Sequence, residues 1–166
     1  MSRVFLISDL HFGHESMAKM RGFSSAEQHD EHIIEAWNRV VHKNDKVWIL
    51  GDITMEDPSH YPLLHKLKGA KHVIMGNHDL ARHSKHLILY VDSIAAMTRY
   101  KKCWLTHCPV HPRELEFKVE RNIHGHLHEY VVKEGFGFDE KIDKRYINVS
   151  CERVDYTPQL FDDLIK

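Results

Sequence analysis

Short apolar runs in the first half of the chain alternate with polar loops and amphipathic stretches. Residues 4–7, 46–50 and 72–75 have the length and apolar character of buried strands, and each run ends in a polar turn. Between them, the spacing of apolar side chains predicts a helix from residue 24 or 25 to about 41 and a second over residues 57–68. This alternation of strand and helix is typical of parallel β-α-β units.

The second half has apolar runs but no long amphipathic helix between them. Its pattern predicts strands over residues 90–100, 102–106, 123–128, 130–136 and 146–149. We therefore expect an α/β (α+β) fold with two packed sheets rather than one open doubly wound sheet. Because the chain contains no internal repeat and no Pro/Gly-rich linker, residues 1–166 are expected to form a single domain.

Composition limits the classes of function. The 166 residues carry 23 Lys+Arg and 24 Asp+Glu, a balance that argues against a strongly basic nucleic-acid binder or a polybasic membrane-surface protein. No apolar run approaches the length of a membrane span, and the first residues show no signal-peptide pattern. The cysteines are odd in number and form no C-x-x-C pair, which favours a reducing, cytoplasmic setting. Cys108 is interpreted as structural.

The chain contains 16 histidines, a common metal ligand, and the positions of some of them indicate a metal site. Polar residues with oxygen or nitrogen donors follow the apolar runs, where the loops of an α/β sheet gather at one edge. They are Asp9, His11, Asp52, Asn77, His107, His126 and His128. Such a set, without sulfur, is sufficient for two divalent cations such as Mn, Fe, Zn or Ni.

The spacing within this set suggests how it would work. Asp9-x-His11 and His126-x-His128 would each place alternate side chains on one side of an extended segment. Asp52 is the expected bridge, because a carboxylate can bind two cations and a neutral imidazole cannot. Two metals about 3.5–4 Å apart would share a hydroxide aimed at a phosphorus atom. Glycines precede several candidates, where a tight turn or close backbone approach would aim the next side chain: Gly51, Gly76 and Gly125.

These motifs, in this order, resemble the calcineurin-like metallophosphoesterase family. They are Asp9-x-His11, Gly51-Asp52, Gly76-Asn77-His78-Asp79, His107 and Gly125-His126-x-His128. The resemblance covers residue 4 to about 150 and implies a β sandwich flanked by helices. It is strongest to the small single-domain phosphodiesterases of bacteria and their viruses that open with Asp-x-His-Phe-Gly-His, as residues 9–14 do here.

The resemblance also implies roles for individual residues. One metal would be held by Asp9, His11, Asp52 and His128, and the other by Asp52, Asn77, His107 and His126. The metals would be two divalent ions, with Mn expected first and Fe, Ni or Zn as alternatives. His78 would stabilise the transition state or protonate the leaving oxygen, and Asp79 would orient His78.

The substrate expected from this resemblance is a small phosphate ester. A phosphodiester, such as a cyclic or linear nucleotide, is the first expectation, because an uncapped two-metal site accepts a second ester group. A phosphomonoester is the alternative, and a non-catalytic interaction scaffold is a further one. Protein dephosphorylation is not expected, because Gly51-Asp52-Ile-Thr-Met-Glu-Asp57 and Asp79 depart from the motifs of the protein phosphatases. The oligomeric state stays open.

Other basic residues have two interpretations. His14 could contact a substrate phosphate or be only a loop residue, and Arg113 could bind a phosphate oxygen or belong to a solvated charged loop. His29 and His32, beside Glu27, Asp30 and Glu31, are interpreted as part of the polar outer face of the first long helix.

Overall fold

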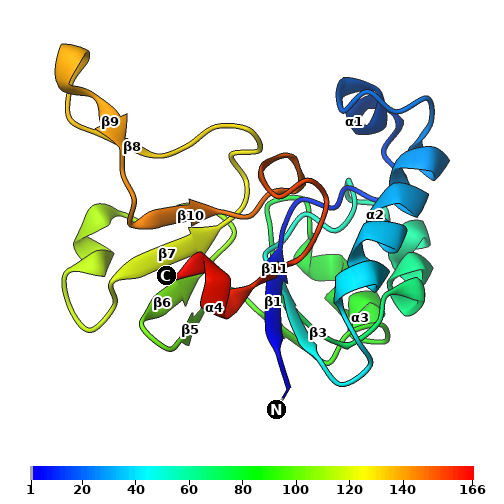
Figure 1. Cartoon of the computed structure of the whole chain (residues 1–166). Helices are drawn as coiled ribbons and strands as arrows, with labels where there is room; N and C mark the ends of the chain where they lie inside the picture. Colours follow the sequence, from blue (N-terminus) through cyan, green and yellow to red (C-terminus); the bar gives the residue numbers. More distant parts are fainter. Residues whose placement is uncertain (1) are drawn as a thin grey trace.

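The computed structural model describes residues 2–166, and its N-terminal half is built on a mainly parallel sheet (Figure 1). The five strands lie in the order β11 (Gln159–Leu160), β1 (Val4–Ile7), β2 (Lys46–Ile49), β3 (Ala70–Ile74) and β4 (Ser93–Ala95). Strands β1 to β4 are parallel, and β11 pairs with β1 antiparallel. The expected parallel units are confirmed, so the carboxyl ends of β1, β2 and β3 meet at one edge.

A second, four-stranded sheet is formed by the later part of the chain. Its order is β10 (Tyr146–Asn148), β7 (Arg121–His124), β6 (Cys103–Leu105) and β5 (Thr98–Tyr100). A separate two-stranded hairpin, β8 (Lys133–Glu134) and β9 (Lys141–Ile142), projects from the body of the molecule (Figure 1). The prediction of two sheets rather than one open sheet is confirmed.

Helical segments connect the strands, and some of the longer ones cover the outer face of the first sheet (Figure 1). The longer ones are α1 (Glu15–Met20), α2 (Ala26–Val40) and the 3-10 helix η1 (Pro58–Lys66). The short ones are η2 (Ala81–His83), α3 (Ser84–Leu87), η3 (Pro112–Leu115), η4 (Gly137–Asp139), η5 (Cys151–Arg153) and α4 (Phe161–Leu164). None of the helices within residues 2–166 is long and apolar enough to cross a membrane.

α2 begins where the sequence placed it. The Ser25 hydroxyl oxygen accepts a hydrogen bond from the backbone N–H of Gln28 at 3.1 Å, and the Gln28 side-chain oxygen accepts in return from the backbone N–H of Ser24. The first bond satisfies a backbone donor that the first helical turn leaves free, and the second ties the residue before the cap to the helix. Ser25, rather than Ser24, is therefore the cap.

Several expected elements are wrong in kind or in length. The segment 57–68 is a 3-10 helix rather than an α-helix, because Pro62 inside it lacks the N–H that an α-helix needs. The expected strand 90–100 is divided, with β4 in the first sheet and β5 in the second. In the expected strand 130–136 only Lys133–Glu134 pairs, and the strand expected over 123–128 ends at His124. Helix α1 was not predicted.

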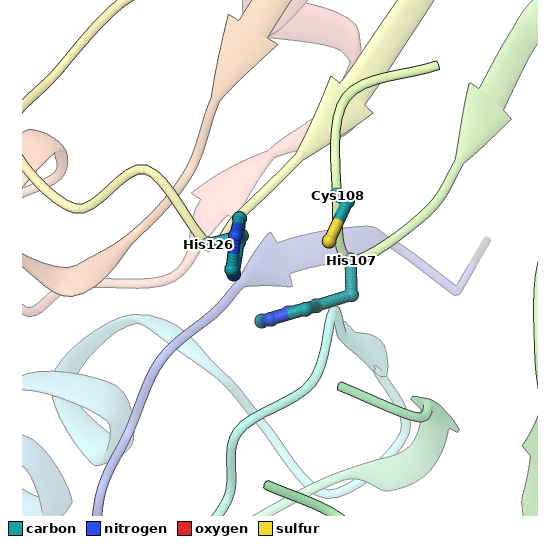
Figure 2. A group of neighbouring side chains, drawn as sticks. All are labelled: His107, Cys108 and His126. Atoms are coloured by element: carbon teal, nitrogen blue, oxygen red, sulfur yellow. The ribbon is translucent and has the colours of Figure 1, made fainter. Parts of the chain in front are cut away.

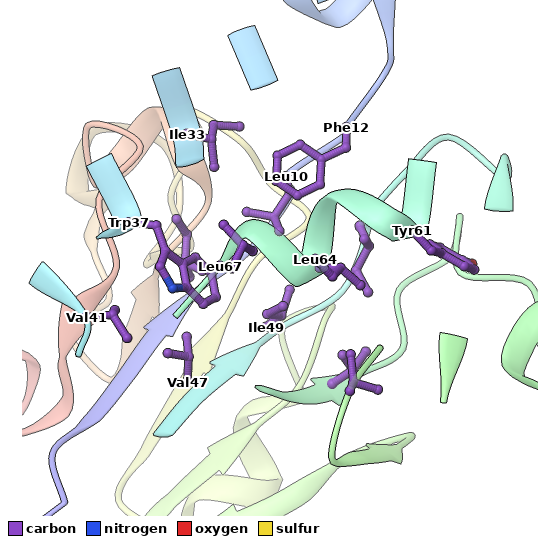
Figure 3. Close-up of a cluster of buried hydrophobic side chains, with 14 of the residues drawn as sticks. Leu10, Phe12, Ile33, Trp37, Val41, Val47, Ile49, Tyr61, Leu64 and Leu67 are labelled. Atoms are coloured by element: carbon purple, nitrogen blue, oxygen red, sulfur yellow. The ribbon is translucent and has the colours of Figure 1, made fainter. Parts of the chain in front are cut away.

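The core has one layer on each face of the first sheet, because successive side chains of a strand point to opposite faces. Phe5 and Ile7 pack with Ile33 and Trp37 of α2. Figure 3 shows Ile33 and Trp37 in this layer. Leu6 faces the other way and packs with residues of both sheets, among them Leu50, Leu105, Ile123 and Val149. Truncating such a fully buried leucine to alanine costs about 2–5 kcal/mol. The two sheets are therefore joined face to face, which brings their loop-bearing edges together.

Candidate metal centre

The candidate ligands lie in loops that leave the strands at the adjoining edges of the two sheets. The loop after β1 runs beside the loop after β2: the backbone N–H groups of Asp9 and His11 donate to the carbonyls of Gly51 and Asp52, both at 3.0 Å. On the second sheet, the backbone N–H of Gly125 donates to the His107 carbonyl at 2.9 Å. Backbone hydrogen bonds therefore set the positions of these loops before any side chain meets a ligand.

The local backbone differs from the extended conformation expected around these residues. The candidates in question have left-handed φ angles: Asp9 (61°), His11 (48°), Asp52 (54°), His126 (68°) and His128 (50°). The interpretation of Asp9-x-His11 and His126-x-His128 as extended pairs is therefore wrong. Left-handed backbone costs a non-glycine residue of the order of 1 kcal/mol or more and concentrates at functional sites. Here it accompanies the turns that bring Asp9, His11 and His128 to one centre.

The first cluster consists of Asp9, His11 and His128. One donor atom from each lies within 4.8 Å of the others. His11 is 1% exposed, and neither of its ring nitrogens has a hydrogen-bond partner among the described residues. Burial lowers the pKa of His11 to about 3, so the ring is neutral. A buried, unpaired and neutral imidazole is unfavourable by itself and fits a metal ligand.

A second cluster consists of Asp9, Asp52 and His107, again with donor atoms within 4.8 Å of one another. His107 Nδ1 lies 2.8 Å from the Leu50 carbonyl, which can only accept, so Nδ1 carries the proton and Nε2 is left for a ligand. That Nε2 lies 2.9 Å from Asn77 Oδ1 and 3.4 Å from Asp52 Oδ2. Asp52 Oδ2 is also 3.9 Å from His11 Nε2, so this carboxylate lies between the two clusters.

A third group brings a sulfur atom to the centre. Figure 2 shows His107, Cys108 and His126 as neighbours, and their donor atoms lie within 4.8 Å of one another. The rings of His107 and His126 have centroids 5.0 Å apart. Cys103 and Cys151 are buried, whereas Cys108 is exposed. The interpretation of Cys108 as a structural residue stays a prediction.

The glycines before the ligands serve the close approach that the sequence suggested. Gly51 has a φ of +95°, a conformation that L side chains rarely adopt. A Cβ at Gly76 would collide with the Asp52 carboxylate, and one at Gly125 would collide with the side chains of Ser8 and Asp9. Both collisions are with groups that form the centre, so a larger residue would displace candidate ligands.

Asp79 positions the loop around Asp52 rather than the ring of His78, and the expected orienting contact is wrong. Its buried carboxylate accepts hydrogen bonds from the backbone N–H groups of Asp52 (2.8 Å), Ile53 (3.1 Å) and Gly76 (2.9 Å). His78 is tied to the centre through its own backbone N–H, which donates to Asp52 Oδ1 at 3.0 Å. The carboxylate nearest its ring is Glu56, 3.5 Å from Nδ1.

Glu152 and Arg21 support the centre, although no motif in the sequence marks either residue. Glu152 Oε1 lies 2.8 Å from His128 Nδ1, which leaves Nε2 of that ring for a ligand. Arg21 donates to Glu152 Oε1 at 2.8 Å and to the Asp9 carbonyl at 2.8 Å. Burial raises the pKa of Glu152, but the hydrogen bond with His128 and the charge of Arg21 outweigh it and hold this pKa at about 2.

The same network corrects the interpretation of α2. His29 is fully buried and Asp30 is 6% exposed, so neither belongs to a polar outer face. His29 Nε2 lies 2.9 Å from Arg21 Nη1, and its Nδ1 lies 3.1 Å from Asp30 Oδ1. Asp30 in turn accepts from the backbone N–H of Gly13 at 2.9 Å. These contacts link α2 to the loop that carries His11.

The two proposed substrate contacts have different surroundings. His14 is half-buried, and its ring centroid lies 6.1 Å from that of His11, so it borders the centre. The Arg113 side chain is 73% exposed and lies 3.5 Å from the Glu116 carboxylate. Among the described residues its partners are surface groups, not candidate ligands.

Comparison with known sequences identifies relatives along the whole chain. The calcineurin-like phosphoesterase superfamily domain matches residues 2–149. Uncharacterized protein MJ1445 of Methanocaldococcus jannaschii is 33% identical over 171 residues, which cover 100% of this chain and 91% of that protein. The Gene 66 protein of Mycobacterium phage D29 is 30% identical over 164 residues, covering 80% of this chain and 82% of its own.

Solved structures share the fold. The protein of unknown function AQ665 from Aquifex aeolicus superposes with a TM-score of 0.73 at 25% identity, covering 99% of this chain and 98% of that one. A structure described as a novel archaeal phosphodiesterase has a TM-score of 0.52 at 20% identity, covering 92% and 86%, and supports the fold alone. The sequence matches and the clustered donors agree: the chain belongs to the calcineurin-like phosphoesterase superfamily and is a metal-dependent phosphoesterase.

Proposed function

We propose that this protein hydrolyses a small phosphodiester, such as a cyclic or linear nucleotide, at a centre of two divalent metal ions. The observation that carries the proposal is the position of Asp52 between two clusters of donors. Its Oδ2 lies 3.9 Å from His11 Nε2 on one side and 3.4 Å from His107 Nε2 on the other. One carboxylate between two imidazole nitrogens is the arrangement that a bridging ligand requires.

The residues fit metal ions by their chemistry. Asp9, His11, Asp52 and His128 would hold one ion, and Asp52, Asn77, His107 and His126 the other. The unpaired nitrogens of His11 and the burial of Asp9 and Asp52 support this assignment, because a cation would compensate both. Oxygen and imidazole donors suit Mn, which we propose first, with Fe, Ni or Zn as alternatives. Divalent ions bound there would supply an activated water and offset the charge of the phosphate.

His78 is the proposed catalytic residue outside the ligand set. Its side chain is 25% exposed, and its ring centroid is 5.9 Å from that of His11, so the ring borders the centre and can meet a substrate. The backbone N–H bond to Asp52 holds it there. We assign its ring the transfer of a proton to the leaving alkoxide oxygen, or stabilisation of the charge developing on it. Asn77 would contribute to neutralising the phosphoryl charge, and Asp79 would hold the loop that carries Asp52.

A diester is favoured over a monoester because the centre is open. Asn77 is exposed, and His78, His126 and His128 are only half-buried, so the outer side of the centre leaves space for a second ester group. A phosphomonoester is the alternative substrate. A non-catalytic scaffold is disfavoured, because every position that the family uses for metal, and His78, carries a competent side chain.

Turnover of two aryl phosphates tests this proposal. Purified protein with its metal content determined would be assayed with bis(4-nitrophenyl) phosphate and with 4-nitrophenyl phosphate. We expect metal-dependent hydrolysis of both with a higher kcat/KM for the diester. A higher kcat/KM for the monoester would make the protein a phosphatase, and metal-loaded protein inactive on both would support the scaffold.

A further inference from the structure

A small groove opens beside His128, outside the ring of candidate ligands. One wall is formed by Met17 and Met20 at the side of α1, and the other by Tyr130 and Tyr156 in loops after β7 and η5. Its volume is about 250 Å³. Complete ligand pockets have volumes of about 300–1,000 Å³, so this groove suits one part of a ligand rather than a whole one.

The side chains that line the groove suit an apolar, planar ligand group. Met20 is 81% exposed and Tyr130 is 69% exposed, although both are large apolar side chains beside a polar centre. The thioether sulfur of methionine packs favourably against an aromatic ring, and a tyrosine ring stacks on another aromatic ring. An aromatic ring placed here would cover both side chains.

The charges of the groove argue for an uncharged occupant. Its cation is Arg21, whose side chain is only 2% exposed and is paired with Glu152 at 2.7 Å. The same guanidinium lies 2.8 Å from the Asp9 carbonyl and 2.9 Å from His29 Nε2. Because these partners occupy its donors, Arg21 cannot receive a second phosphate or a carboxylate. A neutral substituent is the better match.

The wall formed by Tyr130 and Tyr156 is held in place by the folded protein. The Asn148 side-chain amide donates to the carbonyls of His128 and Tyr130, both at 2.8 Å, so the candidate ligand and the groove wall belong to one clamped loop. Tyr156 has a left-handed φ of 54°, and its ring centroid lies 5.4 Å from that of Phe23. Strained backbone of this kind is retained where surrounding contacts hold a side chain in place.

We propose that this groove binds a planar aromatic substituent of the phosphodiester, such as a nucleobase, while the phosphorus lies at the metal centre. The groove adjoins His128, so one substrate would contact both. The proposal rests on the proposed function and assigns Met20 and Tyr130 as specificity-determining residues for it.

Binding of two phosphonates that cannot be hydrolysed tests the groove. Phenylphosphonate and methylphosphonate carry the same charged group and differ in the aromatic ring. Calorimetric titration of the Mn-loaded protein is expected to give a Kd about tenfold lower for phenylphosphonate, as one stacked ring provides. In the variants Tyr130→Ser and Met20→Ser, the ratio of the methylphosphonate Kd to the phenylphosphonate Kd should fall to about two or less. The Kd of methylphosphonate itself should be unchanged.

The control is Phe138→Ser, because Phe138 is fully exposed on the β8–β9 hairpin and lines no part of the groove. It should keep the tenfold preference. Equal affinities of the wild type for the two phosphonates, or an unchanged preference in both groove variants, would overturn the proposal that the groove binds an aromatic substituent. Neither result would affect the proposed phosphoesterase function. If neither phosphonate binds, the proposed function fails together with the groove proposal.

Discussion

The two sheets contribute to the candidate centre in different ways. Asp9, His11 and Asp52 follow strands of the first sheet and are at most 2% exposed, in loops held by backbone hydrogen bonds. His126 and His128 come from the second sheet and are half-buried, and His128 is held by the Glu152 side chain. We call Asp9, His11 and Asp52 the fixed half of the centre, because they are buried in loops held by backbone hydrogen bonds. We call His126 and His128 the adjustable half, because they are only half-buried and His128 also depends on the Glu152 side chain, which can be changed without rebuilding the core. His107 of the second sheet is buried and bonded to the Leu50 carbonyl, so it resembles the fixed half.

The largest effect should follow from a change in the fixed half. Asp52→Asn keeps the size of the side chain and its acceptor for the His78 N–H but removes the charge between the two clusters. We expect loss of most bound metal and a fall in turnover of at least about 10³-fold. Metal analysis and kcat/KM would be compared with those of Asp139→Asn, an exposed carboxylate on the hairpin. Full metal content in Asp52→Asn would contradict the role of this residue.

His78→Ala should separate catalysis from metal binding. Removing a proton donor costs about 10²–10⁴-fold in turnover, and the metal content should be unchanged, since His78 is not assigned to either ion. His86→Ala, an exposed histidine, should match the wild type. Equal loss of metal in His78→Ala and Asp52→Asn would refute the separate roles assigned to them.

Glu152→Gln should weaken metal binding by the adjustable half without abolishing it. Loss of a carboxylate that orients a ligating histidine reduces metal affinity about 10–100-fold. The loss should concern the ion held by His128, while the ion held by His107 remains. Calorimetric titration with Mn would show one weakened and one unchanged site, and Glu35→Gln on the exposed face of α2 should change neither. Unchanged Mn affinity at both sites would contradict the proposed role of Glu152 in orienting His128.

The smallest effect concerns pH. The hydrogen bond with Glu152 raises the pKa of His128, so its ring binds a proton at a higher pH than an ordinary histidine does. Because only the neutral ring binds metal, affinity and turnover should fall as the pH drops, and the raised pKa places the start of this fall above the ordinary histidine value of about 6.5. Glu152→Gln should shift this fall to lower pH. A flat activity profile down to pH 5 would contradict the prediction.

The same contrast explains what could be predicted from the sequence. Asp9, Asp52 and Asn77 stand directly after apolar strands, so their convergence follows from local order and parallel topology. Glu152 lies 24 residues after His128 and 131 residues after Arg21, and no periodicity marks such a partner. The sequence could not show whether Asp79 orients His78 or holds the loop of Asp52. Only the folded backbone shows which N–H groups surround the Asp79 carboxylate.

The most direct test of the central claim is the number of metal ions that the wild-type chain binds. The metal-free protein would be titrated with Mn by calorimetry, and the bound metal would then be counted by elemental analysis. Asp52 between two clusters predicts two ions per chain, with the Asp52→Asn variant retaining neither at full affinity. A single ion per chain, or none, in fully folded and active protein would contradict the two-metal centre.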